Sequence, residues 1–314
     1  MSLESVLLSR RTPHDRVTVR APAKINLHLS VGRLRSDGFH DLTTVFQAVG
    51  LYDEVTLTRA DELTVTVEGE GADLVPLDAT NLAARAVCLL AAQTGNEPGI
   101  AVHIRKGIPV AGGCAGGSAD AAAALVGCAA LWGAELSRDQ LAEVGARLGS
   151  DVPFGLHGGT ALGTGRGEQL TPVLEQGSYC WVLALSEQGL STPAVYDELD
   201  RQRQVGPVGV VADPAEVLAA LRRGDAVALG HSLGNDLQAA ALALQPALRP
   251  LLEAARELGA LGALVSGSGP TVAVLARDAT YADALAAALT GQGLCASVIR
   301  VDGPVAGARV VQAH

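Results

Sequence analysis

The segment PVAGGCAGGSADAAAAL (residues 109–125) decides the fold, because it combines a glycine-rich turn with the start of a helix. A short apolar strand is predicted just before it, over residues 100–104, and an alanine-dense helix within and after it, over residues 118–132. Glycine admits positive φ and lets a ligand approach the backbone amides, while the first turn of a helix offers unpaired N–H groups and a positive dipole end. The segment therefore predicts a cradle for an anion such as phosphate.

Two other phosphate-binding patterns can be tested against the sequence. A P-loop needs a lysine directly after its last glycine, and neither Lys24 nor Lys106, the only lysines of the chain, follows a glycine. No strict Gly-x-Gly-x-x-Gly is present, which weakens a dinucleotide-binding interpretation. The alternative that the segment is only a tight turn, which needs flexible residues and binds no ligand, stays open.

Composition limits the class of protein. The 314 residues suit two compact domains better than one, and 48% apolar with 18% charged residues excludes a disordered chain. A formal charge of −10 argues against nucleic-acid and anionic-membrane partners. Five widely spaced cysteines without a Cys-x-x-Cys pair predict reduced thiols, and no segment is typical of a secretory signal or a spanning helix. We therefore expect a cytoplasmic protein.

Hydrophobic patterning predicts an α+β fold, with a strand-rich first half and helices that alternate with a small sheet in the second. Strands are predicted over residues 17–20, 25–31, 43–49, 54–58, 63–67, 181–185, 263–265, 272–275 and, as the last one, 296–301. Further helices are predicted after Thr80-Asn81 and Ser137 and over residues 279–289, with a loop over 205–213. The domain boundary is placed within residues 160–190, which divides the chain into residues 1–170 and 171–314.

Three segments resemble the motifs of the GHMP kinases, the family of galactokinase, homoserine kinase, mevalonate kinase and phosphomevalonate kinase. They are APAKINLHLSVG (21–32), PVAGGCAGGSADAAAAL (109–125) and LVSGSGPTVAVL (264–275), and their order and spacing match over almost the whole chain. The resemblance implies an ATP-dependent kinase for a small phosphate-bearing metabolite. It also implies a ribosomal-protein-S5-domain-2-like N-terminal lobe and a ferredoxin-like C-terminal lobe, with the active site in the cleft between them.

Two further segments narrow the resemblance within the family. RSDGFHDL (35–42) and LGSDVPF (148–154) are similar to the branch that phosphorylates the 2-hydroxyl of 4-diphosphocytidyl-2-C-methyl-D-erythritol, in non-mevalonate isoprenoid biosynthesis. The expected partners are therefore this cytidylyl-methylerythritol and ATP. We expect a monomer or a weak homodimer.

The resemblance also assigns catalytic roles. Asp151 would be the general base that accepts the proton of the substrate hydroxyl, and Lys24 would stabilise that carboxylate and the transferred phosphoryl group. Asn26 would lie on the same face one strand period later and bind the substrate. Without the resemblance, Asp151 would be a turn-forming carboxylate and Lys24 a surface ammonium.

The glycine-rich segment is expected to bind the ATP phosphates, and Mg²⁺ is the expected metal cofactor. The residues predicted to bind ATP are Pro109, Val110, Ala111, Gly112, Gly113, Cys114, Ala115, Gly116, Gly117, Ser118 and Ala119. Ser118 and Asp120 are the candidate metal ligands. Ala111, Cys114 and Ala115 stand where many relatives have glycine, which narrows the accessible φ range. A thiol at a helix start, such as that of Cys114, can have a lowered pKa.

The substrate base is assigned to an aromatic cluster. Phe39 and His40 would offer a stacking face and a hydrogen-bond partner, and Tyr196 would cover the second face of cytosine, at about 1–3 kcal/mol per stacked contact. A loop anchor packed on the core is the alternative for the Phe39-His40 pair. The loop of Ser266, Gly267, Ser268 and Gly269 would approach the phosphates and shape the cleft, unless it is a simple hairpin turn.

Three other functions stay open on the sequence alone. The chain could be another GHMP enzyme, of the homoserine, mevalonate or phosphomevalonate kinase type or a related decarboxylase, which turnover of different alcohols would distinguish. It could be a non-catalytic nucleotide-binding regulator, in which Asp151→Ala would leave ADP release unchanged. A dinucleotide-binding oxidoreductase is the most distant alternative, testable by NAD(H) binding.

Overall fold

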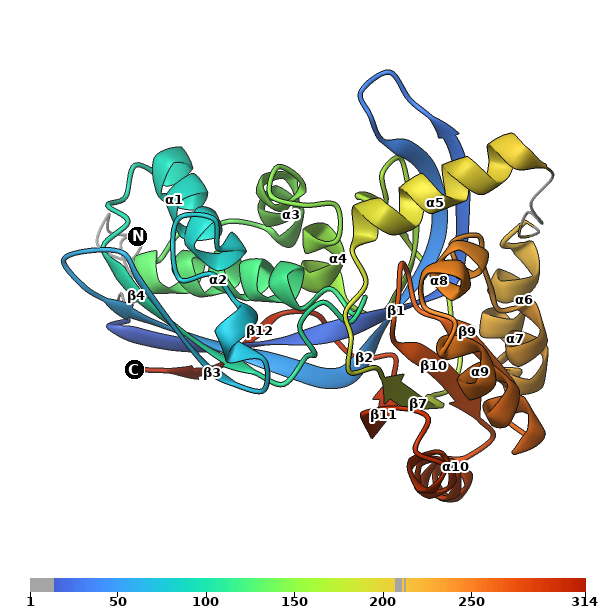
Figure 1. Cartoon of the computed structure of the whole chain (residues 1–314). Coiled ribbons are helices and arrows are strands. Elements are labelled where there is room, and N and C mark those ends of the chain that lie inside the picture. Colours follow the sequence, from blue (N-terminus) through green and yellow to red (C-terminus); the bar gives the residue numbers. More distant parts are fainter. Residues whose placement is uncertain (1–13, 207–210, 212) are drawn as a thin grey trace, which may run out of the picture.

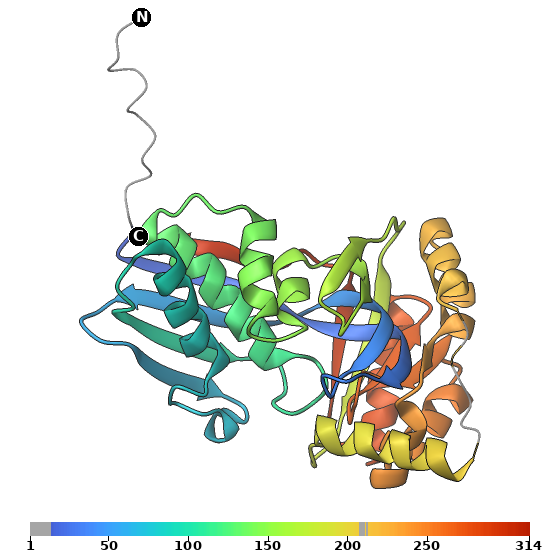
Figure 2. The same cartoon turned by 90° about the horizontal axis from the view of Figure 1, so that it is seen from above.

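The computed structural model describes residues 14–206, 211 and 213–314, so most of the predicted loop over residues 205–213 lies outside the described residues. The chain forms two sheets with helices packed against them (Figures 1 and 2). The first sheet has eight strands in the order β12-β1-β2-β4-β3, with β5 joined to β2 and β6, and β8 joined to β1. The second has four antiparallel strands in the order β11-β7-β10-β9.

The strands of the first sheet are β1 (Arg16–Leu34), β2 (His40–Arg59), β3 (Thr64–Gly69), β4 (Ile100–Lys106), β5 (Thr160–Thr164), β6 (Gln169–Pro172), β8 (Gly234–Asn235) and β12 (Arg309–Ala313). Those of the second sheet are β7 (Tyr179–Leu185), β9 (Gly262–Val265), β10 (Val272–Ala276) and β11 (Ser297–Gly303). The helices are α1 (Leu82–Thr94), α2 (Gly116–Trp132), α3 (Arg138–Ala146), α4 (Val152–His157), α5 (Thr192–Val205), α6 (Ala215–Arg223), α7 (Ala226–Ser232), α8 (Gln238–Leu244), α9 (Leu248–Glu257) and α10 (Ala279–Gly291).

Two long strands replace the four short ones that the sequence predicts at the start of the chain. β1 has 19 residues and β2 has 20, and they pair along most of their length. The predicted break at Ala-Pro-Ala-Lys was wrong, because Pro22 is accommodated by a register shift between Pro22 and Ala23. A bulge of this kind lets a strand contain a residue without an N–H donor. Lys24 therefore lies inside a strand and not in a loop.

Helix α2 lies at the centre of the N-terminal part and is covered on nearly all sides (Figures 1 and 2). It begins at Gly116, two residues before the predicted start, and ends at Trp132, which Gly133 follows in the left-handed conformation. Its alanines allow close contact with β1 and β2. At Gly127 an added Cβ would come within 2.2 Å of the Leu57 side chain, so any larger residue there would force Leu57 to move. The close packing fixes where the first turn of α2 lies.

Two features of the sheets escaped the sequence analysis. The glycine-rich residues 158–168 form most of a β5–β6 hairpin, and the strand predicted as the last, over residues 296–301, is followed by β12. All five side chains of β12 are exposed, so no alternation of apolar residues marks it. β12 pairs with β1 and returns the chain to the first sheet. The boundary predicted between residues 170 and 171 lies in β6, just before the chain enters the second sheet, and stays a prediction.

Among the described residues, no helix combines the length and apolar character that crossing a membrane requires.

Candidate active site

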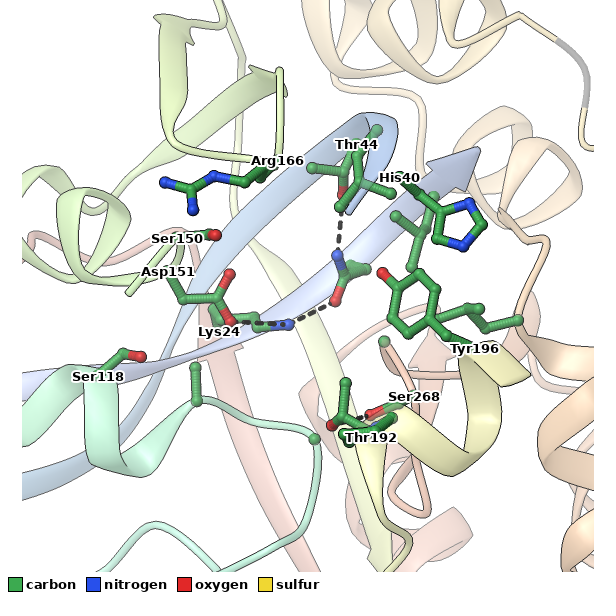
Figure 3. A pocket seen from close by; sticks show the side chains of 18 of the residues that line it. Lys24, His40, Thr44, Ser118, Ser150, Asp151, Arg166, Thr192, Tyr196 and Ser268 are labelled. Atoms are coloured by element: carbon green, nitrogen blue, oxygen red, sulfur yellow. Dashed lines mark hydrogen bonds and ion pairs between the residues drawn. The ribbon is translucent and has the colours of Figure 1, made fainter. Parts of the chain in front are cut away.

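A cavity of about 770 Å³ lies where the β1–β2 pair, the glycine-rich segment and α5 meet (Figure 3). The predicted site residues that line it are Lys24, Asn26, Phe39, His40, Pro109, Ala111, Gly112, Gly113, Ala115, Gly116, Gly117, Ser118, Asp151, Tyr196, Gly267 and Ser268. The predicted residues that do not line it are Val110, Cys114, Ala119, Asp120, Ser266 and Gly269. Residues from six separate segments of the chain thus share one cavity.

Lys24 projects from the middle of β1 into this cavity (Figure 3). Its Nζ donates to Asn26 Oδ1 at 2.7 Å and lies 3.7 Å from Asp151 Oδ2. The Asn26 amide is itself fixed, because its Nδ2 donates to Thr44 Oγ1 at 2.8 Å. The side chain of Lys24 is 9% exposed and lies over the Phe46 ring, so its charge acts in a site with little water. The predicted placement of Lys24 and Asn26 on one face is confirmed.

Asp151 is the residue that precedes helix α4, where a carboxylate would ordinarily cap the helix. Its side chain makes no cap hydrogen bond, and it points into the cavity toward Lys24 (Figure 3). The side chain is 32% exposed, so a substrate can reach it. Asp151 therefore does not act as a turn-forming or capping carboxylate, because its side chain contacts Lys24 across the cavity and makes no hydrogen bond to the helix.

The glycine-rich segment and the loop of residues 266–269 pack directly on each other. Thr271 donates its backbone N–H to the Gly112 carbonyl at 3.3 Å. A Cβ added at Gly113 would lie 2.7 Å from the Ser266 carbonyl oxygen, and φ is +75° there, so only glycine suits this contact. The 266–269 loop is anchored in turn by Asn235, whose Nδ2 donates to the Val265 and Gly267 carbonyls. The loop is therefore part of the cavity wall and not a free hairpin turn.

Two alanines of the glycine-rich segment adopt the left-handed conformation. Ala111 has φ 56° and Ala115, which precedes the first residue of α2, has φ 60°. A left-handed backbone costs an L-residue roughly 1–2 kcal/mol, which glycine avoids. Ala111 and Ala115 thus adopt the left-handed conformation that glycine would adopt there, at a cost in backbone strain.

Ala115→Gly should leave the free energy of unfolding unchanged or raise it by up to about 1 kcal/mol, because relief of the left-handed strain exceeds the added freedom of the unfolded chain. Ala115→Val should destabilise the protein, since a β-branched residue fits poorly at positive φ. Urea unfolding of both variants measures the difference. A loss of more than 1 kcal/mol in Ala115→Gly would show that the methyl group has a packing role.

A buried cluster of three ionisable groups lies beneath the glycine-rich segment. Lys106 Nζ contacts Asp53 Oδ2 at 2.5 Å and Asp120 Oδ2 at 2.7 Å, and none of the three side chains is more than 4% exposed. Asp53 Oδ1 accepts the N–H groups of Gly107 and Ile108, which lead into the segment. A Cβ added at Gly116 would lie 3.2 Å from Lys106 Nζ. The cluster thus supports both ends of the phosphate cradle from below.

The charges of this cluster shift each other's protonation. Burial, together with the neighbouring Asp53 carboxylate, raises the pKa of Asp120 to about 8 although Lys106 acts to lower it. Burial also acts to lower the pKa of Lys106, but the two carboxylates offset this and raise it above its ordinary value. Because Asp120 contacts Lys106 and does not line the cavity, Ser118 is the candidate metal ligand that faces a substrate.

Cys114 differs from the expectation for a thiol at a helix start. Its side chain is buried behind the cradle, and its Sγ lies 3.8 Å from the Gly112 carbonyl oxygen. Burial raises the pKa of Cys114, although the nearby Lys24 charge acts in the opposite direction. The lowered pKa that a thiol at a helix start can have is therefore absent at Cys114, because burial outweighs the hydrogen bond with Thr271 and the charge of Lys24.

The aromatic side of the cavity is built around His40 and Tyr196. Their rings stack with centroids 5.3 Å apart, which leaves no room for a base between them. The ring nitrogens of His40 face the Asp200 carboxylate at 3.2 Å and the Gly32 carbonyl at 3.1 Å. Burial, with the Asp151 charge as a second cause, raises the pKa of Tyr196. Because His40 covers one face of the Tyr196 ring, only its other face could stack on a planar ligand.

Phe39 is 49% exposed at the mouth of the cavity, and the Arg166 guanidinium lies 4.9 Å from the centre of its ring. The sequence analysis did not single out Arg166, although its position between two glycines in GTGRGE could have drawn attention to it. Other cavity-lining polar residues that it missed are Thr44, Ser150, Thr192, Asp197 and Asp200. Thr192 Oγ1 lies 2.8 Å from Ser268 Oγ and so joins α5 to the 266–269 loop.

Comparison with protein families and known proteins gives a consistent result. Residues 81–159 match the family described as GHMP kinases N terminal domain, and residues 217–293 match GHMP kinases C terminal. The chain is 57% identical over 295 residues to the 4-diphosphocytidyl-2-C-methyl-D-erythritol kinase of Nocardia farcinica, which covers 94% of this chain and 96% of that protein. It is equally similar to the enzyme of the same name from Streptomyces avermitilis, with 57% identity over 94% of this chain and 99% of that protein.

Solved structures agree with these matches. A crystal structure of 4-(cytidine 5′-diphospho)-2C-methyl-D-erythritol kinase superposes with a TM-score of 0.73 and 32% identity, over 91% of this chain and 98% of that one. Homoserine kinase from Cytophaga hutchinsonii has the same fold, with a TM-score of 0.76 and 21% identity over 96% of this chain and 99% of that one. The predicted two-lobed α+β fold is thereby confirmed.

Proposed function

The chain belongs to the GHMP kinase family, and we propose that it transfers the γ-phosphate of ATP to the 2-hydroxyl of 4-diphosphocytidyl-2-C-methyl-D-erythritol, which gives the 2-phosphate and ADP in isoprenoid precursor biosynthesis. The observation that carries this proposal is the contact of Lys24 with Asp151 inside the cavity. Around that contact the glycine-rich segment, the aromatic rings and the 266–269 loop line one cavity. This arrangement suits two ligands that meet at one reacting centre.

Asp151 would take the proton of the substrate hydroxyl. Phosphoryl transfer passes through a loose transition state, so the proton leaves late and a carboxylate of ordinary basicity suffices if it is well placed. Lys24 holds that carboxylate in position and brings a positive charge to the transferred phosphoryl group. Asn26 fixes Lys24 through its Oδ1, and Thr44 fixes Asn26, so the ammonium is positioned before the substrates bind.

The ATP phosphates would lie against residues 109–119. The backbone amides of this segment and the N-terminal end of α2, a helix of 17 residues, provide donors and a positive dipole end. These fixed dipoles compensate for the scarcity of lysine in a chain with a formal charge of −10. The Asp53–Lys106–Asp120 cluster would act indirectly, by holding the segment in place.

Mg²⁺ is part of this proposal, as the ion that neutralises charge on the bound ATP. Mg²⁺ keeps several waters and usually needs only one or two protein oxygens beside the phosphates. The residues of the cavity fit this requirement, because Ser118 presents a hydroxyl at the first turn of α2 and Asp151 a partly exposed carboxylate. The described residues contain no cluster of three or more His, Cys, Asp or Glu side chains suited to a metal, so the phosphates would supply most of the ligands.

Cytosine would stack on the open face of Tyr196, with Phe39 at the mouth of the cavity as its second contact. His40 would act mainly by supporting Tyr196, because both of its ring nitrogens have protein partners. Ser266, Gly267, Ser268 and Gly269 would close the cavity on the phosphate side. Ser266 contributes from behind the surface, where its Oγ accepts the Asn26 N–H at 3.4 Å.

The decisive experiment is an ADP-release assay with the cytidylyl alcohol, mevalonate and homoserine, each offered with ATP and Mg²⁺. We expect turnover of the cytidylyl alcohol alone, because only this substrate presents a base to the aromatic side of the cavity. Turnover of mevalonate or homoserine without turnover of the cytidylyl alcohol would replace this proposal with another GHMP activity. Binding of ATP without any turnover would favour a nucleotide-binding regulator.

We propose that the enzyme works in the cytoplasm on small molecules, as a monomer or weak homodimer, without nucleic-acid or membrane partners. The cysteines Cys88, Cys114, Cys128, Cys180 and Cys295 are free thiols, which supports a reducing compartment. The formal charge of −10 supports the expectation that polyanionic partners are absent.

A further inference from the structure

The charges that line the cavity do not match the charges of its proposed ligands. Its basic side chains are Lys24, His40 and Arg166, and its carboxylates are Asp151, Asp197 and Asp200. ATP and a cytidylyl diphosphate would both bring negative charge to this cavity. A second cation is therefore needed for the diphosphate of the alcohol substrate, beyond the one at the transferred phosphoryl group.

Two of the three basic side chains already have close partners. Lys24 is held by Asn26 and Asp151, and His40 contacts Asp200 and Gly32. Arg166 has only a distant ion pair, with 3.9 Å between its Nε and Glu168 Oε1. Its side chain is 32% exposed. Of the three, the guanidinium of Arg166 thus has the most unused hydrogen-bonding capacity.

The position of Arg166 in the cavity also suits contact with the substrate diphosphate. Its guanidinium is 4.9 Å from the Phe39 ring, on the side where a base would stack. In Figure 3, Arg166 lies above Ser150 and Asp151, while Ser118 and the start of α2 lie on the other side of Asp151. In the substrate the diphosphate connects the base to the alcohol. Arg166 therefore lines the same cavity as Phe39 and Asp151, and in Figure 3 it lies on the side of Asp151 away from Ser118.

The β5–β6 turn fixes the backbone from which the Arg166 side chain projects. Gly165 and Gly167, on either side of Arg166, have φ of +71° and +101°, which L side chains rarely adopt. The Arg166 N–H donates to Glu168 Oε2 at 2.7 Å. At Gly163 an added Cβ would lie 2.9 Å from the Phe46 ring, so the hairpin packs closely on β2. The turn is therefore built around one arginine with a fixed backbone.

On the basis of the proposed function, we infer that Arg166 binds the diphosphate of the cytidylyl alcohol and makes these charges a requirement for tight substrate binding. A guanidinium suits this task because its planar donors can bind two phosphate oxygens at once. Arg166 does not take part in the proton transfer. It positions the substrate so that the 2-hydroxyl reaches Asp151.

Binding of CDP and of cytidine, measured by calorimetry, separates recognition of the phosphates from recognition of the base. The wild type should bind CDP more tightly than cytidine. Arg166→Met should weaken CDP by about 10- to 100-fold, the effect of losing charge-assisted hydrogen bonds, and leave cytidine within about twofold. Arg166→Lys should keep part of the CDP affinity, because it keeps the charge but loses the paired donors. Arg201→Met, on the exposed face of α5 where Arg201 pairs with Glu198, is the matched control and should change neither ligand.

Kinetics give a second measurement. In Arg166→Met the KM for the cytidylyl alcohol should rise and the KM for ATP should stay within about twofold, because ATP lies on the other side of Asp151. Equal weakening of CDP and cytidine would show that Arg166 contacts the base, and an unchanged CDP affinity would show that it contacts neither phosphate; both results overturn the inference. A wild type that binds neither CDP nor cytidine, with or without ATP, would overturn the proposed function itself.

Discussion

Asp151→Asn should lower kcat for the cytidylyl alcohol by about 10²–10⁴-fold, the usual range for loss of a general acid–base group. Asparagine keeps the size of the side chain and can still face Lys24, but it cannot accept the proton of the 2-hydroxyl. The KM for ATP should change little, because the phosphate cradle is built from other residues. Steady-state ADP release at saturating ATP measures the effect, and single-turnover kinetics show whether the chemical step is the one that slows.

Two further variants make this result specific. Asp139→Asn removes a carboxylate from the exposed face of α3, where the Asp139 side chain is 88% exposed, and should leave kcat unchanged. Lys24→Met should lower kcat as strongly as Asp151→Asn, since Lys24 contacts that carboxylate and, in the proposed mechanism, compensates charge at the phosphoryl group. If Asp151→Asn retained wild-type turnover, Asp151 would not be the base. Equal ADP release by wild type and Asp151→Ala would support a non-catalytic nucleotide-binding role.

Lys106→Met should lower the free energy of unfolding by about 3–5 kcal/mol, the typical cost of removing one partner from a buried ion pair. The two carboxylates that remain, Asp53 and Asp120, are almost completely buried and would face each other without a cation. Because Asp53 also accepts the amides of Gly107 and Ile108, the KM for ATP should rise in the surviving folded protein. Urea unfolding gives the stability, and the assay at fixed cytidylyl alcohol gives the KM.

The preceding residue of β4 offers a matched control for this prediction. Arg105 is 58% exposed and pairs with Glu54 on the surface, so Arg105→Met should cost less than about 1 kcal/mol. Asp53→Asn combined with Asp120→Asn in the Lys106→Met background should recover part of the lost stability, since no charge is then left unpaired. If Lys106→Met and Arg105→Met had the same free energy of unfolding, the buried cluster would contribute no more to stability than the surface ion pair.

The parts of this protein that follow from local chemistry were predictable from the sequence. The glycine-rich turn before α2, the Ser137 cap of α3 and the hairpin around Ser266 each depend on neighbouring residues, and the structure confirms them. The resemblance of APAKINLHLSVG and LGSDVPF to family segments predicted that Lys24 and Asp151 act together, although they are 127 positions apart in the chain. Composition alone could not have shown that contact.

The parts that depend on distant contacts were not predictable in this way. Pro22 suggested a strand end, but pairing with β2 continues past it through a bulge. The pKa of Cys114 is set by burial rather than by the helix start beside it. Asp120 points toward Lys106 of strand β4 and not into the cavity. Arg166 and Asp200 line the cavity because of how a hairpin and α5 pack, and nothing in their local sequence states which side chains they will meet.

Strand β12 connects the end of the described chain to its beginning, because it pairs with β1 along residues 17–20. During synthesis the ribosome must therefore release residues 309–313 before the first sheet receives its outer strand. Until then the backbone groups along that edge of β1 stay open to pairing with another chain. Completion of the first sheet thus depends on the C-terminal end of the described chain, and a protein cut after residue 170 would be left with an unpaired edge along residues 17–20 of β1.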